Sequence, residues 1–193
     1  MTRERRRLRL SAEFVADCVD EGTFLSIMSA FPTGVTVVTT LDAQGRPCGL
    51  TCSAACSLSK SPPMLLVCIH NASRVLRAIL HCDRFIVNFL RDNRESISSL
   101  FASQECDRFS SVSWRPSRLG GLPWLLNDTI AYSECRLASA VQAGDHTVLI
   151  SAILDGQVLG DTVGPLMYWR RSYGRWPTEE DAITMALSLA AEG

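Results

Sequence analysis

The sequence GLTCSAACSLSKSPPMLLVCIH, residues 49–70, is the stretch on which the predicted fold depends. Its first half is made mainly of small and hydroxyl-bearing residues, whereas Met64–Ile69 is an unbroken apolar run that follows two prolines and precedes His70. A run bounded in this way is typical of a fully buried strand. Small residues let a flat ligand approach the backbone and offer it main-chain and hydroxyl hydrogen bonds. We therefore expect a pocket wall built on a β-barrel; the alternative is an ordinary sheet edge rich in serine and alanine.

The residues on both sides of this stretch predict more strands, joined by short turns, and a few helices. β-branched and alternating patterns indicate strands at residues 35–41, from 47 onward, and at 85–90, 124–143, 146–160 and 166–169. Helices are expected at 11–30 in two pieces, at 71–81 with Asn71 or Ser73 as N-cap, from Asp92 or Asn93 to about Ala102, and from 178 onward. Tight turns are expected at 42–46 and 143–145. Together they predict a mainly β (α+β) fold, a closed or split antiparallel barrel with flanking helices.

Composition restricts the class of protein. The chain has 193 residues, of which 47% are hydrophobic and 20% charged, as in a single globular domain. No apolar segment or cleavage site follows the arginines of the first nine residues, and no apolar run is long enough to span a bilayer. Beyond residue 9 acidic residues outnumber basic ones, so a nucleic-acid contact by the arginine-rich tail is only an alternative. We expect a cytoplasmic protein with a basic tail and helix at 1–22, a barrel domain at 23–174 and a helix at 175–193.

The eight cysteines are expected to be reduced thiols packed in the core. Cys48, Cys52 and Cys56 recur every fourth residue, which on a strand places all three on one face. Because no C-x-x-C pair occurs, we expect no metal site, and a redox-thiol protein is a disfavoured alternative.

Common catalytic motifs are absent from the chain. It has no G-x-G-x-x-G sequence after a strand, no P-loop and no nucleophile elbow. His146 lies in the predicted turn between two long strands, where loop residues on a rigid rim often contact ligands. Spacing alone makes His146 only a candidate for a functional residue.

Eight segments, in order, together resemble the short-chain flavin reductases of two-component flavin monooxygenases. They are FPTGVTVVTT, GLTCSAACSLSKSPPMLLVCI, NAS, FIVNFL, DRFSSVSW, GLPWLLNDTIAYSECRL, GDHTVLISAILDG and PLMYWRRSYG, and they extend from Phe31 to Gly174. The resemblance implies a split β-barrel of the FMN-binding type, a homodimer, and hydride transfer from NADH or NADPH to FMN or FAD. It also implies that reduced flavin diffuses to a separate monooxygenase component.

The resemblance also implies roles for single residues. The cofactor-binding residues would be Thr51, Cys52, Ser53 and Ala54 at the isoalloxazine edge, Ser57, Leu58 and Ser59 beside the ring and ribityl chain, Asn71, Ser73 and Arg74 at the phosphate, and Pro32, Thr33 and Gly34 at a turn near the flavin. Hydroxyl and amide donors at a helix N-terminus, with a guanidinium nearby, suit a phosphate. His146 matches the histidine of the family's G-D-H turn and would orient the nicotinamide or shield the reaction.

Two departures from the family pattern affect the pocket. Ser53-Ala54 stands where the family often has Asn-Ser, and Ala55-Cys56 stands where Phe with Thr or Ser is common. Backbone donors remain in both segments, so flavin binding is expected, while the preference between FMN and FAD is open. The alternative function is a flavin-binding barrel that does not turn over NAD(P)H, against which the G-D-H turn argues.

Overall fold

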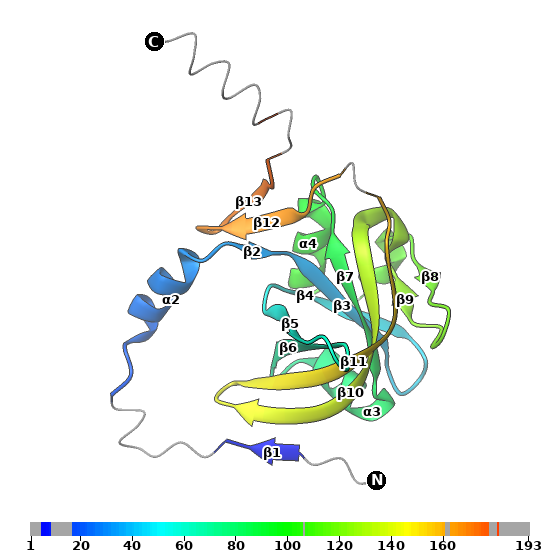
Figure 1. Cartoon of the computed structure of the whole chain (residues 1–193), viewed down its shortest axis with the longest axis horizontal. Helices are drawn as coiled ribbons and strands as arrows, with labels where there is room; N and C mark the ends of the chain where they lie inside the picture. Colours follow the sequence, from blue (N-terminus) through cyan, green and yellow to red (C-terminus); the bar gives the residue numbers. More distant parts are fainter. Residues whose placement is uncertain (1–4, 9–16, 106, 161–162, 178–180, 182–193) are drawn as a thin grey trace.

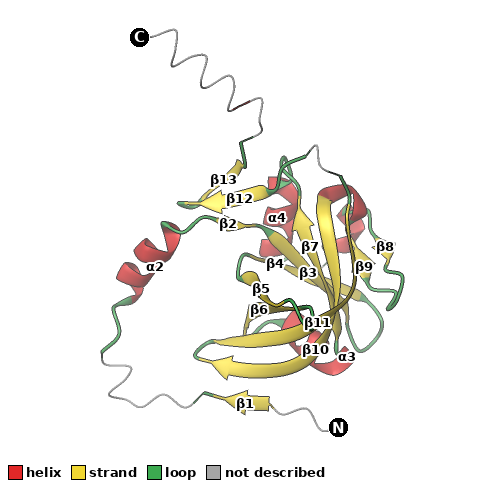
Figure 2. Ribbon diagram, viewed as in Figure 1, coloured by secondary structure: helices red, strands yellow, loops and turns green. Residues whose placement is uncertain are grey.

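The computed structural model describes residues 5–8, 17–105, 107–160, 163–177 and 181. The helices are α2 (Glu21–Ser29), α3 (Arg74–Cys82) and α4 (Glu95–Ala102), with short 3₁₀ turns at Phe109–Ser111 and Leu126–Asp128. The strands are β1 (Arg5–Arg7), β2 (Thr33–Gly34), β3 (Thr36–Leu41), β4 (Pro47–Cys52), β5 (Ala55–Ser59), β6 (Met64–His70), β7 (Arg84–Leu90), β8 (Arg115–Pro116), β9 (Pro123–Trp124), β10 (Thr129–Ala143), β11 (His146–Val158), β12 (Leu166–Trp169) and β13 (Ser172–Arg175). The mainly β content that the sequence predicts is confirmed (Figure 2).

One large curved sheet forms the body of the molecule (Figure 1). Its strands follow the order β4-β3-β7-β10-β11-β6-β5, and β1 pairs in parallel with β10. The end strands β4 and β5 are consecutive in the chain and are joined by Ser53 and Ala54, so the sheet curls until its two ends approach each other. No ladder among the described strands pairs β4 with β5, so the sheet is open in its hydrogen bonding at this point.

The apolar run of residues 64–69 forms β6, but only one of its faces is fully buried. Leu65, Val67 and Ile69 are buried in the core, whereas Met64, Leu66 and Cys68 are partly exposed. The prediction of a fully buried strand is therefore wrong for the second face. Successive side chains point to opposite faces of a strand, and here only one face meets the core.

Helix α3 packs against β3 and β4 of the curved sheet and begins where the sequence predicts. The Ser73 hydroxyl caps it by accepting a hydrogen bond from the Val75 N–H at 3.2 Å. Its inner face buries Leu76 and Ile79 in the main core, which also contains Phe85 of β7. The cap thus fixes where the helix starts, and apolar burial holds it against the sheet.

Helix α4 ends at Ala102 as expected, but its predicted cap is wrong. Its N-cap is Arg94, which makes no side-chain capping bond, and neither Asp92 nor Asn93 takes that place. Arg94 instead pairs with Asp128 at 2.7 Å. A contact with a distant loop, rather than local capping, therefore positions this helix.

The long strand pair and the chain ends differ in part from expectation. β10 begins at Thr129 rather than Trp124, because β9 and a 3₁₀ turn come first. Of the expected helix at 11–30, only α2 is observed; residues 11–16 and most of the expected C-terminal helix lie outside the described residues. β12 and β13 form an unpredicted hairpin that pairs with β2. No helix in the described part of the chain is long and apolar enough to cross a membrane.

Candidate functional site

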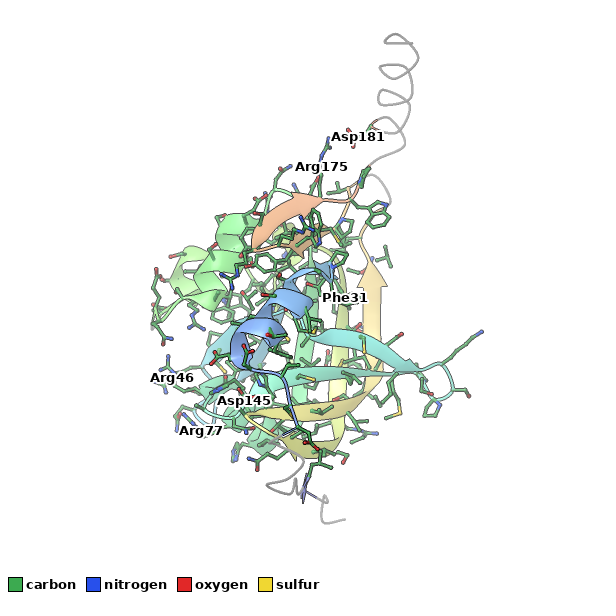
Figure 3. The ribbon with its side chains drawn as sticks, turned by 90° about the vertical axis from the view of Figure 1, so that its left-hand side faces the viewer. Phe31, Arg46, Arg77, Asp145, Arg175 and Asp181 are labelled. Atoms are coloured by element: carbon green, nitrogen blue, oxygen red, sulfur yellow. The ribbon has the colours of Figure 1, made fainter. Side chains whose placement is uncertain are left out.

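A cleft of about 1230 Å³ opens between the end of β4, the start of α3, the loop after α4 and His146 of β11. Seven of the predicted site residues line it, namely Thr51, Cys52, Ser53, Ala54, Ser73, Arg74 and His146. They come from three separate parts of the sequence, so the fold brings them together. Figure 3 shows Arg46, Arg77 and Asp145 on the same side of the molecule; of these, Arg46 lines the cleft.

The segment from Thr51 to Ala54 is the link between the two end strands of the sheet. The Thr51 hydroxyl donates to the Ser98 carbonyl of α4 at 2.6 Å, and the Cys68 N–H donates to the Ala54 carbonyl at 2.9 Å. Between these anchors, Ser53 and Ala54 are exposed. The link therefore presents a small, fixed backbone surface to the cleft, which suits a flat ligand.

Three arginines line the cleft, and they differ in what they already bind. Arg46 pairs with Asp42 at 2.8 Å. Arg108 donates to the carbonyls of Gly49, at 2.7 Å, and of Ser103. Arg74, in the first turn of α3, is exposed and forms no ion pair with a described residue. Arg74 is thus the cleft arginine whose guanidinium is available to an anion at a helix N-terminus.

His146 lies at the edge of the cleft, beside a second histidine. Its Nδ1 is 2.7 Å from Asp145 Oδ1, and its side chain is 45% exposed. This contact and the positive charge that His146 can carry hold the pKa of the Asp145 carboxyl below its usual value. Gly144 adopts a φ of 59°, which a glycine accommodates without strain, so the turn can present His146.

Asn71 supports the turn that carries His146, and its predicted contact with the flavin phosphate remains a prediction. Its side chain donates to the Gly144 carbonyl at 3.1 Å and accepts from the Thr147 hydroxyl at 2.7 Å, and its own N–H donates to the Asp145 carbonyl. Asn71 does not line the cleft. It therefore holds the turn that carries His146, rather than facing the site that Arg74 faces.

Six further predicted residues also lie outside the lining of the cleft. Thr33 and Gly34 form β2 and pair with β12, and Pro32 precedes them. Ser57, Leu58 and Ser59 lie on β5, which pairs only with β6 among the described strands. Their predicted contacts with flavin remain predictions.

Three cysteine thiols line the cleft and are held in the protonated form. Burial raises the pKa of Cys48 to about 12 and that of Cys52 to about 11, and burial also raises the pKa of Cys68. A thiol is a weak nucleophile and metal ligand. These cysteines therefore shape the wall rather than react.

Reasoning from the sequence missed several residues of the cleft, above all His70, Arg46 and Arg108. Arg108 belongs to the DRFSSVSW segment, so the resemblance contained a signal for it. His70 ends the apolar strand next to Asn71, but nothing in the local pattern distinguishes it from a solvent-exposed histidine.

Comparison with known proteins identifies the family. A model of the flavin reductase like domain matches residues 28–177, most of the chain. The protein belongs to the flavin reductase family. The flavin reductase (NADH) of Kitasatospora aureofaciens is 56% identical over 186 residues, which cover 96% of this chain and 97% of that protein.

More distant members of the flavin reductase family also resemble this chain in sequence and in structure. The reductase subunit HsaB of a flavin-dependent monooxygenase from Mycobacterium tuberculosis is 36% identical, covering 80% of this chain and 82% of its own. The NADH:FAD oxidoreductase SgcE6 of Streptomyces globisporus, solved with NAD and FAD fragments, superposes with a TM-score of 0.77 at 26% identity, covering 86% of this chain and 99% of that chain. The protein is an oxidoreductase, a flavin reductase that uses FAD or FMN with NADH or NADPH.

The cleft fits these cofactors. Its volume exceeds the roughly 300–1,000 Å³ that is usual for a site holding one drug-sized ligand. The exposed backbone of Ser53 and Ala54 suits a flat ring, and the guanidinium of Arg74 suits a phosphate. A flavin and a nicotinamide nucleotide would therefore find a wall of small residues and an anion-binding group in one place.

Proposed function

We propose that the protein transfers a hydride from the nicotinamide of NADH or NADPH to FMN or FAD in this cleft, and releases the reduced flavin to a separate monooxygenase. The observation that carries the proposal is the joint lining of one cleft by Thr51–Ala54, Arg74 and His146. Flavin supplies the hydride-accepting ring when it is bound. The alternative of a flavin-binding barrel without turnover is disfavoured by the family to which the chain belongs.

The residues of the chain act by placement. Ser53 and Ala54 are exposed between Cys52 and Ala55, and backbone N–H groups there would oppose negative charge on a bound flavin. Arg74 and the N-terminus of α3 would hold the flavin phosphate. His146, held through Asp145, would orient the nicotinamide for transfer. The protein thereby supplies orientation, and the chemistry is that of the cofactors.

Oxidation of NADH and of NADPH by the purified protein, with FMN and FAD each added, tests the proposal. We expect flavin-dependent loss of the nicotinamide absorbance and a preference for one nucleotide and one flavin. Replacing His146 by Ala should raise the nicotinamide KM or slow flavin reduction while flavin binding stays. Loss of flavin binding in that variant would show that the role assigned to His146 is wrong, and flavin binding with no nucleotide oxidation would overturn the reductase mechanism.

Release of the product has its own test. With excess NADH and a large molar excess of flavin over protein, under anaerobic conditions, a diffusing flavin is reduced completely. Reduction of only one flavin per protein molecule would instead mean that flavin is retained. The relatives that are reductase subunits of flavin-dependent monooxygenases support the first outcome.

The proposal includes a homodimer. No residue of α2 is buried, and its Phe24, Ile27 and Met28 are 54%, 58% and 48% exposed. In Figure 1 the helix stands away from the curved sheet. An apolar helix in that position is suited to contact with a second copy. Sedimentation should give twice the mass of the chain, and Ile27→Glu should shift it toward the monomer; a monomeric wild type would contradict the proposal.

A further inference from the structure

His70 and His146 form a pair of rings at the edge of the cleft. The register of β6 and β11 places them directly opposite each other. Their ring centroids are 5.4 Å apart and the rings are nearly perpendicular, at 86°. Both line the cleft. Two strands therefore present two imidazoles to the same cleft. The proposed function uses only that of His146.

The hydrogen bonds at Nδ1 differ between the two rings. His146 Nδ1 lies 2.7 Å from the Asp145 carboxylate, which only accepts, so this nitrogen carries the hydrogen and donates it. His70 Nδ1 accepts from the Ala72 N–H at 3.2 Å, so in the neutral ring the hydrogen is on Nε2. Neither Nε2 has a hydrogen-bond partner among the described residues. The neutral pair thus offers one acceptor, on His146, next to one donor, on His70.

A primary carboxamide has the complementary pattern, because its NH₂ group donates and its carbonyl oxygen accepts. We propose that His70 donates from Nε2 to the carbonyl oxygen of the nicotinamide carboxamide, while His146 Nε2 accepts from its NH₂ group. The inference rests on the proposed position of the nicotinamide beside His146. It assigns to His70 a part in recognising the hydride donor.

The test uses binding rather than turnover, because analogues of NADH differ in reactivity. Inhibition constants of NAD⁺ and of its acetylpyridine analogue, in which a methyl group replaces the NH₂ group, are measured at about pH 8. One hydrogen bond of ordinary strength changes an inhibition constant about twofold to tenfold.

Two variants separate the two contacts. His70→Phe keeps a ring against His146 but has no donor, so it should weaken NAD⁺ and the analogue equally, by about twofold to tenfold. His146→Ala removes the acceptor, so it should weaken NAD⁺ but not the analogue, which already lacks the NH₂ group. His70→Asn restores a donor and should recover part of the loss. His81, exposed on α3 and outside the cleft lining, gives the control variant His81→Ala, which should change neither constant.

Flavin affinity and the thermal unfolding midpoint of each variant show that the cleft is intact. If His146→Ala weakens NAD⁺ but His70→Phe does not, the role assigned to His70 is wrong and the proposed function stands. If neither variant changes nucleotide binding while flavin-dependent turnover persists, the position of the nicotinamide beside His146 is wrong. If His70→Phe weakens NAD⁺ but not the analogue, the two contacts have been assigned to the wrong histidines.

Discussion

Replacing Arg74 by Ala should weaken the binding of FMN but leave that of riboflavin unchanged, because riboflavin has no phosphate. Arg74 is exposed in the first turn of α3, at the edge of the cleft, and has no ion pair with a described residue. A hydrogen bond to a charged group contributes about 1.5–3 kcal/mol. Because water screens an exposed guanidinium, the lower end applies, which corresponds to about a tenfold increase in the dissociation constant.

Titration of flavin fluorescence measures both dissociation constants. Arg74→Lys keeps the charge but not the planar pair of donors, so its effect should be smaller. Arg77 provides a matched control, since it is another exposed arginine of α3, lies outside the cleft lining and donates to the Ala72 carbonyl. The difference between FMN and riboflavin should also shrink at high ionic strength. An equal loss for riboflavin, or an equal effect of Arg77→Ala, would refute the assignment of the phosphate to Arg74.

Three further predictions concern the core and the thiols. Ile79 is fully buried against the main core, so Ile79→Ala should lower the free energy of unfolding by about 2–5 kcal/mol in urea denaturation, and the partly buried Leu80 should give a smaller loss when changed to Ala. In the native protein, iodoacetamide at about pH 8 should modify the exposed Cys56 but not Cys48 or Cys52, whose pKa values burial raises to about 12 and about 11; modification of all three, read by mass spectrometry, would contradict this. The folded chain keeps the thiol protons of Cys48 and Cys52 above the ordinary thiol pKa of 9.0, whereas the unfolded chain loses them. The free energy of unfolding should therefore fall as the pH rises from 9.0 toward 12. This fall should be smaller in the variant Cys48→Ala.

Features that depend on a few neighbouring residues are predictable from the sequence. The turn after β3 is held by its own residues, since Asp42 accepts from the Gln44 and Arg46 N–H groups at 2.9 Å. Ser73 caps α3 two residues before the N–H that it binds. Neither needs the rest of the fold, so composition and spacing are enough to indicate them.

The hairpin of β12 and β13 shows where local signals fail. Its turn contains Arg170 and Arg171, both with positive φ, 49° and 63°. Residues other than glycine and asparagine rarely adopt this conformation, so the sequence carries no turn signal there. The residues of this turn do not favour it locally. The hairpin forms together with the pairing of β12 with β2, which lies far away in the chain.

The sequence by itself determined the family, the strand-rich pattern, the Ser73 cap of α3 and the segments from which a site would be built. Only the tertiary structure decided which of those segments meet. It joined Asn71 to the turn at Gly144 while Arg74 lines the cleft, placed Arg108 against Gly49, and set His70 opposite His146 across a strand pair. These contacts join residues about 59–76 positions apart. Sheet register and curvature fix such contacts, and both are properties of the whole core rather than of any local run of residues.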